Sequence, residues 1–290
     1  MKNKKVLIGI VAALIVVVLA VLLLTGVIGG KKQEKIKIAV PNDPTNEGRA
    51  LLLLQAQGLI KLKDDAGITA TKADIVENKL NIEFNEVEAA MVPNVLKDVD
   101  FGIINGNYAL AAKLDKALLY ENAESPYVNI VCVDEKNKDT DLAKALAAAA
   151  LSKDVADFFA ETYKDGSAIS VVENPTDGYD ATVDYDALKG QTVKIVCTLD
   201  PHSYVLEKVK AILAEKDITL EIITVDDYVT PNTMVDSGDV FANFFAHAPY
   251  QDDFNAKNNT HLVSIAGVHV EPMGLYAGQK NDLSVLGLKK

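Results

Sequence analysis

Short runs of strand-forming residues alternate with amphipathic helical stretches along most of this 290-residue chain. Parallel strands need a crossover between them, and a helix usually supplies it, so the alternation predicts an α/β fold with mostly parallel sheets. The predicted strands span residues 36–40, 81–86, 101–104, 127–133, 192–198, 219–224, 240–244 and 263–268. The predicted helices span residues 46–57, 93–97, 141–151, 153–164, 203–216 and 230–236.

An apolar run at residues 6–28 contains no charged or strongly polar side chain, and lysines lie on both sides of it. At about 1.5 Å per residue, a helix of this length spans the roughly 30 Å core of a bilayer. The basic residues that precede it should stay in the cytoplasm, which places the rest of the chain outside. Residues 1–34 are therefore predicted to be a cytoplasmic start, a single-pass anchor in the cell membrane and a linker.

A cleaved signal peptide is the alternative for this run. Its apolar stretch is usually only about 7–15 residues long and is followed by a small-residue cleavage site. Residues 25–31 contain neither a clean site of this kind nor a cysteine that could accept a lipid. These observations favour an uncleaved anchor and leave cleavage as the second interpretation.

Charge and motif content argue against several functional classes. The formal net charge of −12 leaves no basic surface for a nucleic acid. The histidines are scattered, without the HExxH or CxxC spacing of a metal site, so neither a metal nor a cofactor is expected. The absence of GxSxG, P-loop and GxGxxG motifs makes an enzyme on an α/β fold a remote alternative.

The two cysteines, Cys132 and Cys197, each lie within an apolar run that is typical of a buried strand. A disulfide between them is the alternative in an extracytoplasmic protein, although nothing in their spacing requires one. Two separate core thiols are favoured.

Several long segments identify a family. The longest is AVPNDPTNEGRALLLLQ at residues 39–55. The others are GLIKLKD at 58–64, DIVEN at 74–78, INGNYA at 104–109, SPYVN at 125–129, DYVTPN at 227–232, ANFFAHAPY at 242–250 and VHVEPMGLY at 268–276. From about residue 35 to residue 288 the chain resembles the MetQ/NlpA family, the methionine-binding proteins of ABC importers.

The order of these segments differs from the family order, in which the ANFFAHAPY-type segment precedes the PNDPTN-type segment. The chain therefore resembles a circular permutant, with a turn-rich connector at about residues 164–189. Permutation is tolerated where termini are exposed and close together. The resemblance implies a two-lobed type II periplasmic-binding-protein fold, in which residues 35–122 with 277–290 form the first lobe and residues 123–276 form the second.

Polar candidates for ligand binding lie in the first half of the chain. Arg49 is the only arginine and lies in a Pro/Asn/Gly-rich turn that opens a helix. Its planar guanidinium suits the carboxylate of an amino acid, and a solvated first-turn residue is the alternative. Asn46 is also a candidate helix N-cap, and Asn105 also suits a turn. The resemblance implies that these positions line the ligand cleft, with Asn105 binding the amino or carboxylate group.

Aromatic candidates gather around one predicted strand end. Alternate residues of a strand face opposite sides, so Phe245 and His247 can share the cleft while Phe244 faces the core. Aromatic edges contact a thioether with about 0.3–1.5 kcal/mol each, which suits methionine, and ordinary core packing is the alternative for any one ring. The candidates are Tyr228, Phe245, His247 and Tyr250.

The resemblance implies an extracytoplasmic solute-binding protein that captures L-methionine and delivers it to the permease and ATPase subunits of an ABC importer. Glu271, at the expected hinge between the lobes, is the candidate acceptor for the ligand's ammonium group. D-methionine, a methionine derivative or a short methionine-containing peptide are the alternative ligands of the same scaffold.

Overall fold

The computed structural model describes residues 35–122 and 126–289. One compact unit begins at Lys37 and holds the rest of the described chain. The expected membrane helix at residues 6–28 lies outside the described residues. In the part that is described, no helix has both the length and the apolar character needed to cross a membrane.

The first sheet draws strands from both terminal regions of this unit. In sheet order its strands are β4 (Glu83–Val87), β1 (Lys37–Pro41), β5 (Phe101–Ile104), β13 (Gly274–Ala277) and β6 (Leu119–Tyr120). β1 pairs in parallel with β4 and β5, whereas β13 pairs antiparallel with β5 and β6. The connections hold α2 (Pro44–Ala56), α3 (Val92–Val95), α4 (Gly106–Ala111) and a small antiparallel pair, β2 (Lys61–Leu62) with β3 (Ile75–Glu77).

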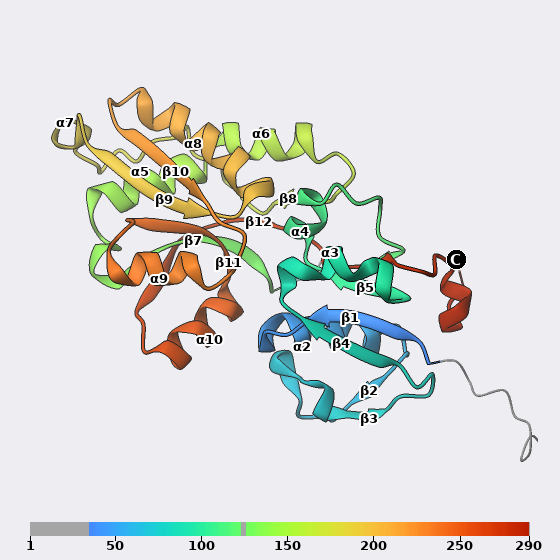
Figure 1. The fold of residues 1–290 in the computed structure, drawn as a ribbon. Coiled ribbons are helices and arrows are strands. Elements are labelled where there is room, and N and C mark those ends of the chain that lie inside the picture. Colours follow the sequence, from blue (N-terminus) through green and yellow to red (C-terminus); the bar gives the residue numbers. More distant parts are fainter. Residues whose placement is uncertain (1–34, 123–125, 290) are drawn as a thin grey trace, which may run out of the picture. The chain divides into compact units, whose positions relative to one another are not determined.

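The second sheet is formed by the middle of the chain. In sheet order its strands are β10 (Thr219–Thr224), β9 (Thr192–Cys197), β11 (Ala242–His247), β7 (Val128–Asp134), β12 (Leu262–Val270) and β8 (Ile169–Ser170). Its helices are α5 (Asp141–Ala150), α6 (Lys153–Thr162), α7 (Tyr185–Leu188), α8 (Tyr204–Ala214), α9 (Thr230–Ser237) and α10 (Ala248–Asn258). α5 and α8 lie on one side of this sheet, and α9 and α10 lie on the other (Figure 1).

The fold is α/β, but the prediction of mostly parallel sheets is wrong because both sheets are mixed. β9 pairs in parallel with β10 and β11, and β7 pairs antiparallel with β11 and β12. β7 and β13 are each reached by a passage from the other sheet rather than by a helical crossover within their own sheet. The crossover argument for parallel pairing therefore does not apply to them.

The core of the second sheet is formed by apolar residues of its strands and helices. Phe159 of α6, Leu146 of α5 and Phe244 of β11 are buried in one cluster between the sheet and its helices. Cys132 and Cys197 are both buried and free, which confirms the prediction of two separate core thiols.

The chain passes from the first sheet to the second after β6 and returns through residues 271–273. β13 starts at Gly274 and pairs with β5, so the boundary predicted at residues 276/277 lies inside a strand of the first sheet. This corrects the boundary, since a strand belongs to the sheet that holds its hydrogen bonds. The predicted connector at 164–189 includes β8, which pairs with β12, and α7.

Candidate ligand-binding site

Arg49 lies in the second turn of α2 with only 4% of its surface exposed. Its Nε donates to Glu121 Oε2 at 2.9 Å, and its Nη2 contacts Glu121 Oε1. The same Nη2 donates to the main-chain oxygen of Glu271 at 2.8 Å, and the guanidinium lies 4.3 Å from the ring centre of Tyr127. Because these partners lie on both passages between the sheets, Arg49 joins the two passages.

Asn46 connects the two sheets through its side-chain oxygen. Its Oδ1 accepts a hydrogen bond from Asn105 Nδ2 at 2.7 Å and lies 3.3 Å from His247 Nε2. Its Nδ2 donates to Asp43, which also caps α2 by accepting from the main-chain N–H of Asn46 at 3.0 Å. Asp43, and not Asn46, is therefore the N-cap of α2, so the cap interpretation of Asn46 is wrong. The side chain of Asn46 lies between Asn105 and His247.

His247 is held in one neutral form by its neighbours. Its Nδ1 accepts a hydrogen bond from the main-chain N–H of Tyr250 at 3.2 Å, which leaves the proton on Nε2 to be donated to Asn46. Burial, followed by the nearby charge of Arg49, lowers the pKa of His247 well below its ordinary value. The ring therefore acts as a neutral hydrogen-bond donor at physiological pH.

Asn105 is the single residue between β5 and α4, at the carboxyl end of a strand, where ligands of α/β proteins commonly bind. Its Oδ1 is buried and, among the described residues, has no hydrogen-bond partner. A buried amide oxygen without a partner costs free energy, so a ligand N–H group placed there would be stabilising.

The aromatic candidates form one cluster beside these polar residues. Tyr228 lies with its ring centre 5.7 Å from that of Phe245 and 5.9 Å from that of Tyr250. Tyr250 Oη donates to the main-chain oxygen of Tyr228 at 2.8 Å, and Tyr228 Oη donates to Asn107 Oδ1 at 2.7 Å. A cavity of about 320 Å³ adjoins Tyr228 and Tyr250, within the usual size range of small-ligand pockets.

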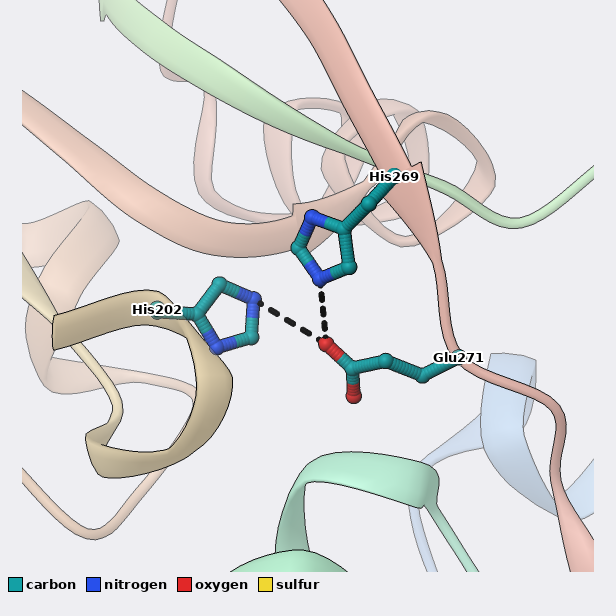
Figure 2. Close-up of side chains that lie close together, drawn as sticks. All are labelled: His202, His269 and Glu271. Carbon is teal, nitrogen blue, oxygen red and sulfur yellow. Dashed lines mark hydrogen bonds and ion pairs between the residues drawn. The ribbon is translucent and has the colours of Figure 1, made fainter. Parts of the chain in front are cut away.

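Glu271 belongs to a buried group with His202 and His269 (Figure 2). Its Oε1 lies 2.6 Å from His269 Nε2 and 3.5 Å from His202 Nε2. Burial lowers the pKa values of His202 and His269 to about 3, so both rings are neutral near pH 7. Burial also raises the pKa of Glu271 to about 7, although the charge of Arg49 acts in the opposite direction. The carboxyl group therefore has two neutral imidazoles beside it instead of a protonated histidine.

The same three side chains are the set of described residues that could hold a metal ion, since their ligand atoms lie within 4.8 Å of one another. Tetrahedral zinc with bonds of roughly 2.0–2.2 Å keeps its ligand atoms roughly 3.3 Å apart. The 2.6 Å between His269 and Glu271 is instead a hydrogen-bond distance. As it stands, the group is a hydrogen-bonded network.

All eight sequence candidates fall into one connected group in the structure. Arg49 contacts the main-chain oxygen of Glu271, and Tyr127 links it to His247, whose ring centre lies 4.8 Å from that of Tyr127. Asn46 contacts Asn105 and His247, and the ring of His247 lies 6.1 Å from that of Tyr250 in the aromatic cluster. Sequence reasoning missed some residues that complete the group. These are Asn107, Glu121, Tyr127, Asn129 and His202.

The position of His202 in the sequence could have identified it as a candidate site residue. His202 lies between the predicted strand 192–198 and the predicted helix 203–216, near the carboxyl end of the strand, where open α/β sheets place their ligand residues. Thr198 Oγ1 lies 2.9 Å from its Nδ1, and Asn129 Oδ1 lies 3.1 Å from its Nε2. Since Asn129 can only accept there, His202 carries its proton on Nε2 and accepts from Thr198.

Comparison with known proteins identifies relatives that match part of the chain. The "Probable D-methionine-binding lipoprotein MetQ" of Pasteurella multocida is 46% identical over 127 residues, which are 42% of this chain and 46% of that protein. The "D-methionine-binding lipoprotein MetQ" of Escherichia coli K12 is 44% identical over 128 residues, which are 42% of this chain and 47% of that protein. This chain thus spans about half the length of these curated relatives.

A solved structure described as "a nutrient binding protein from Burkholderia cenocepacia bound to methionine" is 45% identical, with a TM-score of 0.43 over 46% of this chain and 59% of that chain. The family model described as NlpA lipoprotein matches residues 31–172 and 193–289, which is more than half of the chain. The chain therefore belongs to the NlpA lipoprotein family.

Proposed function

We propose that this chain is an extracytoplasmic solute-binding protein, and not an enzyme, that captures L-methionine or a close analogue for an ABC importer. The observation that carries the proposal is the buried group around Arg49, Asn105 and Glu271. It brings a guanidinium, an unpartnered amide oxygen and a carboxyl group beside an aromatic cluster. These groups complement the carboxylate, the ammonium and the apolar side chain of a zwitterionic amino acid.

The ammonium group of the ligand is assigned to Glu271 and Asn105. A buried carboxylate is stable only when a cation or hydrogen-bond donors accompany it, and an ammonium group supplies both. The carboxylate of the ligand is assigned to Arg49, whose planar fork binds two oxygens at once. The names of the relatives, which describe D-methionine-binding lipoproteins, support methionine as the ligand class and keep the D form as an alternative.

The side chain of the ligand is assigned to the aromatic cluster of Tyr228, Phe245 and Tyr250. A thioether contacts aromatic edges with about 0.3–1.5 kcal/mol per contact. D-methionine, a methionine derivative and a short methionine-containing peptide are the alternatives. Calorimetry on the detergent-solubilised chain with L-methionine, D-methionine, methionine dipeptides and L-leucine tests the proposal. If the chain bound no compound of this panel, the proposal would be refuted.

The fold proposed is the two-lobed type II periplasmic-binding-protein fold in circularly permuted order. One lobe would hold the first sheet and the other the second, and their closure on the ligand would present a closed form to the permease and ATPase subunits. Support for permutation comes from Asp100. Its Oδ2 accepts from the main-chain N–H of Lys37 at 2.8 Å, and its Oδ1 lies 3.0 Å from Lys280 Nζ, so the first strand and the C-terminal segment lie together.

The family match is also interrupted between residues 172 and 193, a range that overlaps the predicted connector at about residues 164–189. A rearranged chain would keep residues 1–34 at its start, continue from the connector to residue 289, join residue 289 to residue 37, and end in the connector. This chain should fold and bind methionine with unchanged affinity. The reason is that the C-terminal segment reaches the first strand through Asp100, and that a break between residues 172 and 193 lies outside the matched regions. Circular dichroism and calorimetry would check this, and failure of the rearranged chain to fold would contradict the permutation.

Membrane attachment is proposed to depend on the apolar run at residues 6–28, with the binding domain outside the cytoplasm. A variant that lacks residues 1–34 should appear in the soluble fraction, whereas a Cys132→Ala, Cys197→Ala variant should stay with the membrane fraction. The cysteines are buried in the core and cannot carry a lipid without local unfolding. Release of the double-cysteine variant, or retention of the truncated one, would contradict the assignment.

A further inference from the structure

We propose that Glu121 is an internal competitor for the carboxylate of the ligand, which holds Arg49 in the unliganded protein and thereby sets the affinity. The inference rests on the proposed function, because it concerns the same guanidinium. It identifies an affinity-determining residue that is not itself among the ligand-contacting candidates.

Glu121 contacts the guanidinium of Arg49 at two points. Both carboxylate oxygens of Glu121 face the guanidinium, one at Nε and the other at Nη2. A ligand carboxylate that bound the guanidinium at Nε and Nη2 would adopt the same two-point geometry. The side chains are 5% and 12% exposed, so solvent screens the pair only weakly.

The carboxylates of Glu121 and of the ligand would share one guanidinium. Arg49 is the only arginine of the chain, so it is the one guanidinium available for both carboxylates. Two carboxylates against one buried guanidinium leave one negative charge uncompensated. The ligand must therefore displace Glu121 from at least one guanidinium nitrogen, and the free energy of that displacement is subtracted from its affinity.

The position of Glu121 adds a structural consequence. Glu121 is the first residue of the first passage between the sheets, directly after β6, and its Oε1 also accepts from the main-chain N–H of Met273 in the second passage at 3.0 Å. Glu121 thus holds Arg49 and the second passage at the same time. A cavity of about 170 Å³ lined by Arg49, Glu121 and Tyr127 gives the displaced carboxylate room to move.

The experiment compares L-methionine with L-methioninamide, which lacks the competing carboxylate, on the detergent-solubilised full chain. Glu121→Gln keeps the shape and an acceptor for Met273 but removes the charge. We expect this variant to bind L-methionine roughly tenfold more tightly. L-methioninamide should show no such gain, because it has no carboxylate to compete with Glu121 and, as a cation, loses attraction when the negative charge is removed. Glu121→Asp, whose shorter arm reaches fewer guanidinium nitrogens, should give a smaller increase and serves if the Gln variant fails to fold.

Glu161→Gln is the matched control. Glu161 is an exposed residue of α6, so its replacement removes one negative charge from the chain without touching Arg49 or the candidate site. It should leave the ratio of the two affinities unchanged. An equal increase in Glu161→Gln would mean a general charge effect and would overturn the proposal.

Failure of the proposed function and failure of the competitor role of Glu121 would give different results. If the wild-type chain binds neither compound, the proposed function fails. If the wild type binds L-methionine and both Glu121 variants bind it equally or more weakly, the proposed function stands and the competitor role is refuted. A purely structural role of Glu121 would lower the melting temperature without changing the ratio of the two affinities.

Discussion

Arg49→Ala is expected to weaken the binding of L-methionine by roughly 10–100-fold, because the ligand carboxylate loses a charge-assisted hydrogen bond worth about 1.5–3 kcal/mol. The same change should lower the free energy of unfolding by about 3–5 kcal/mol, because it removes one partner of a buried ion pair. Glu121 is then left with its charge uncompensated in a nearly buried position. Calorimetry and urea unfolding of the detergent-solubilised chain measure the two effects.

The double variant Arg49→Ala, Glu121→Gln separates these effects. Without the charge of Glu121, no uncompensated carboxylate remains, so a large part of the lost stability should return. The affinity should stay low, because no guanidinium is present for the ligand. An Arg49→Ala variant that keeps the wild-type affinity would show that the carboxylate of the ligand binds elsewhere.

The sequence allowed Arg49 to be predicted but not its partner. Arg49 stands out as a single arginine in a turn that opens a helix, which are local properties. Glu121 lies 72 residues away and resembles any charged residue near a loop. Only the passage of the chain between the sheets brings the two together, and no local pattern encodes that passage.

The missed elements have comparable physical causes. α10 reads APYQDDFNAKN, whose apolar residues do not repeat with the period of a helix, so it was not predicted. β13 is a short segment, GLYA, that follows directly after a proline-containing turn. Its role as a strand is decided by pairing with β5 and β6 and not by its own composition.

The prediction that Phe244 faces the core while Phe245 faces the candidate residues could be made from alternation alone. Phe244 lies in the core cluster of the second sheet, and Phe245 lies with Tyr228 and Tyr250. The irregular pairing between Phe244 and Ala246 was not visible in the sequence. It shifts the pairing register at the point where the strand reaches His247, as bulges often do near functional sites.

The affinity for L-methionine is expected to rise as the pH increases from 6 to 8, by up to roughly tenfold per pH unit below the pKa of Glu271. Burial raises that pKa to about 7, and only the ionised carboxylate attracts the ammonium group of the ligand. His202 and His269, with pKa values of about 3, stay neutral throughout this range. The other charged groups near Glu271 are Arg49, which stays protonated, and Asp200.

The stability of the ligand-free protein should change in the opposite direction. The pKa of Glu271 is higher in the folded chain than its ordinary value of 4.5, so its contribution to stability is fully present below about pH 4.5 and is lost as the pH rises through about 7. Glu271→Gln, which stays neutral, should remove both trends and should bind L-methionine roughly 10–100-fold more weakly than the wild type at pH 8. At pH 6 the two proteins should differ much less, because the wild-type carboxyl group is then largely protonated. Calorimetry and urea unfolding at pH 6, 7 and 8 test this pair of trends, and an affinity that does not vary with pH would exclude Glu271 as the partner of the ammonium group.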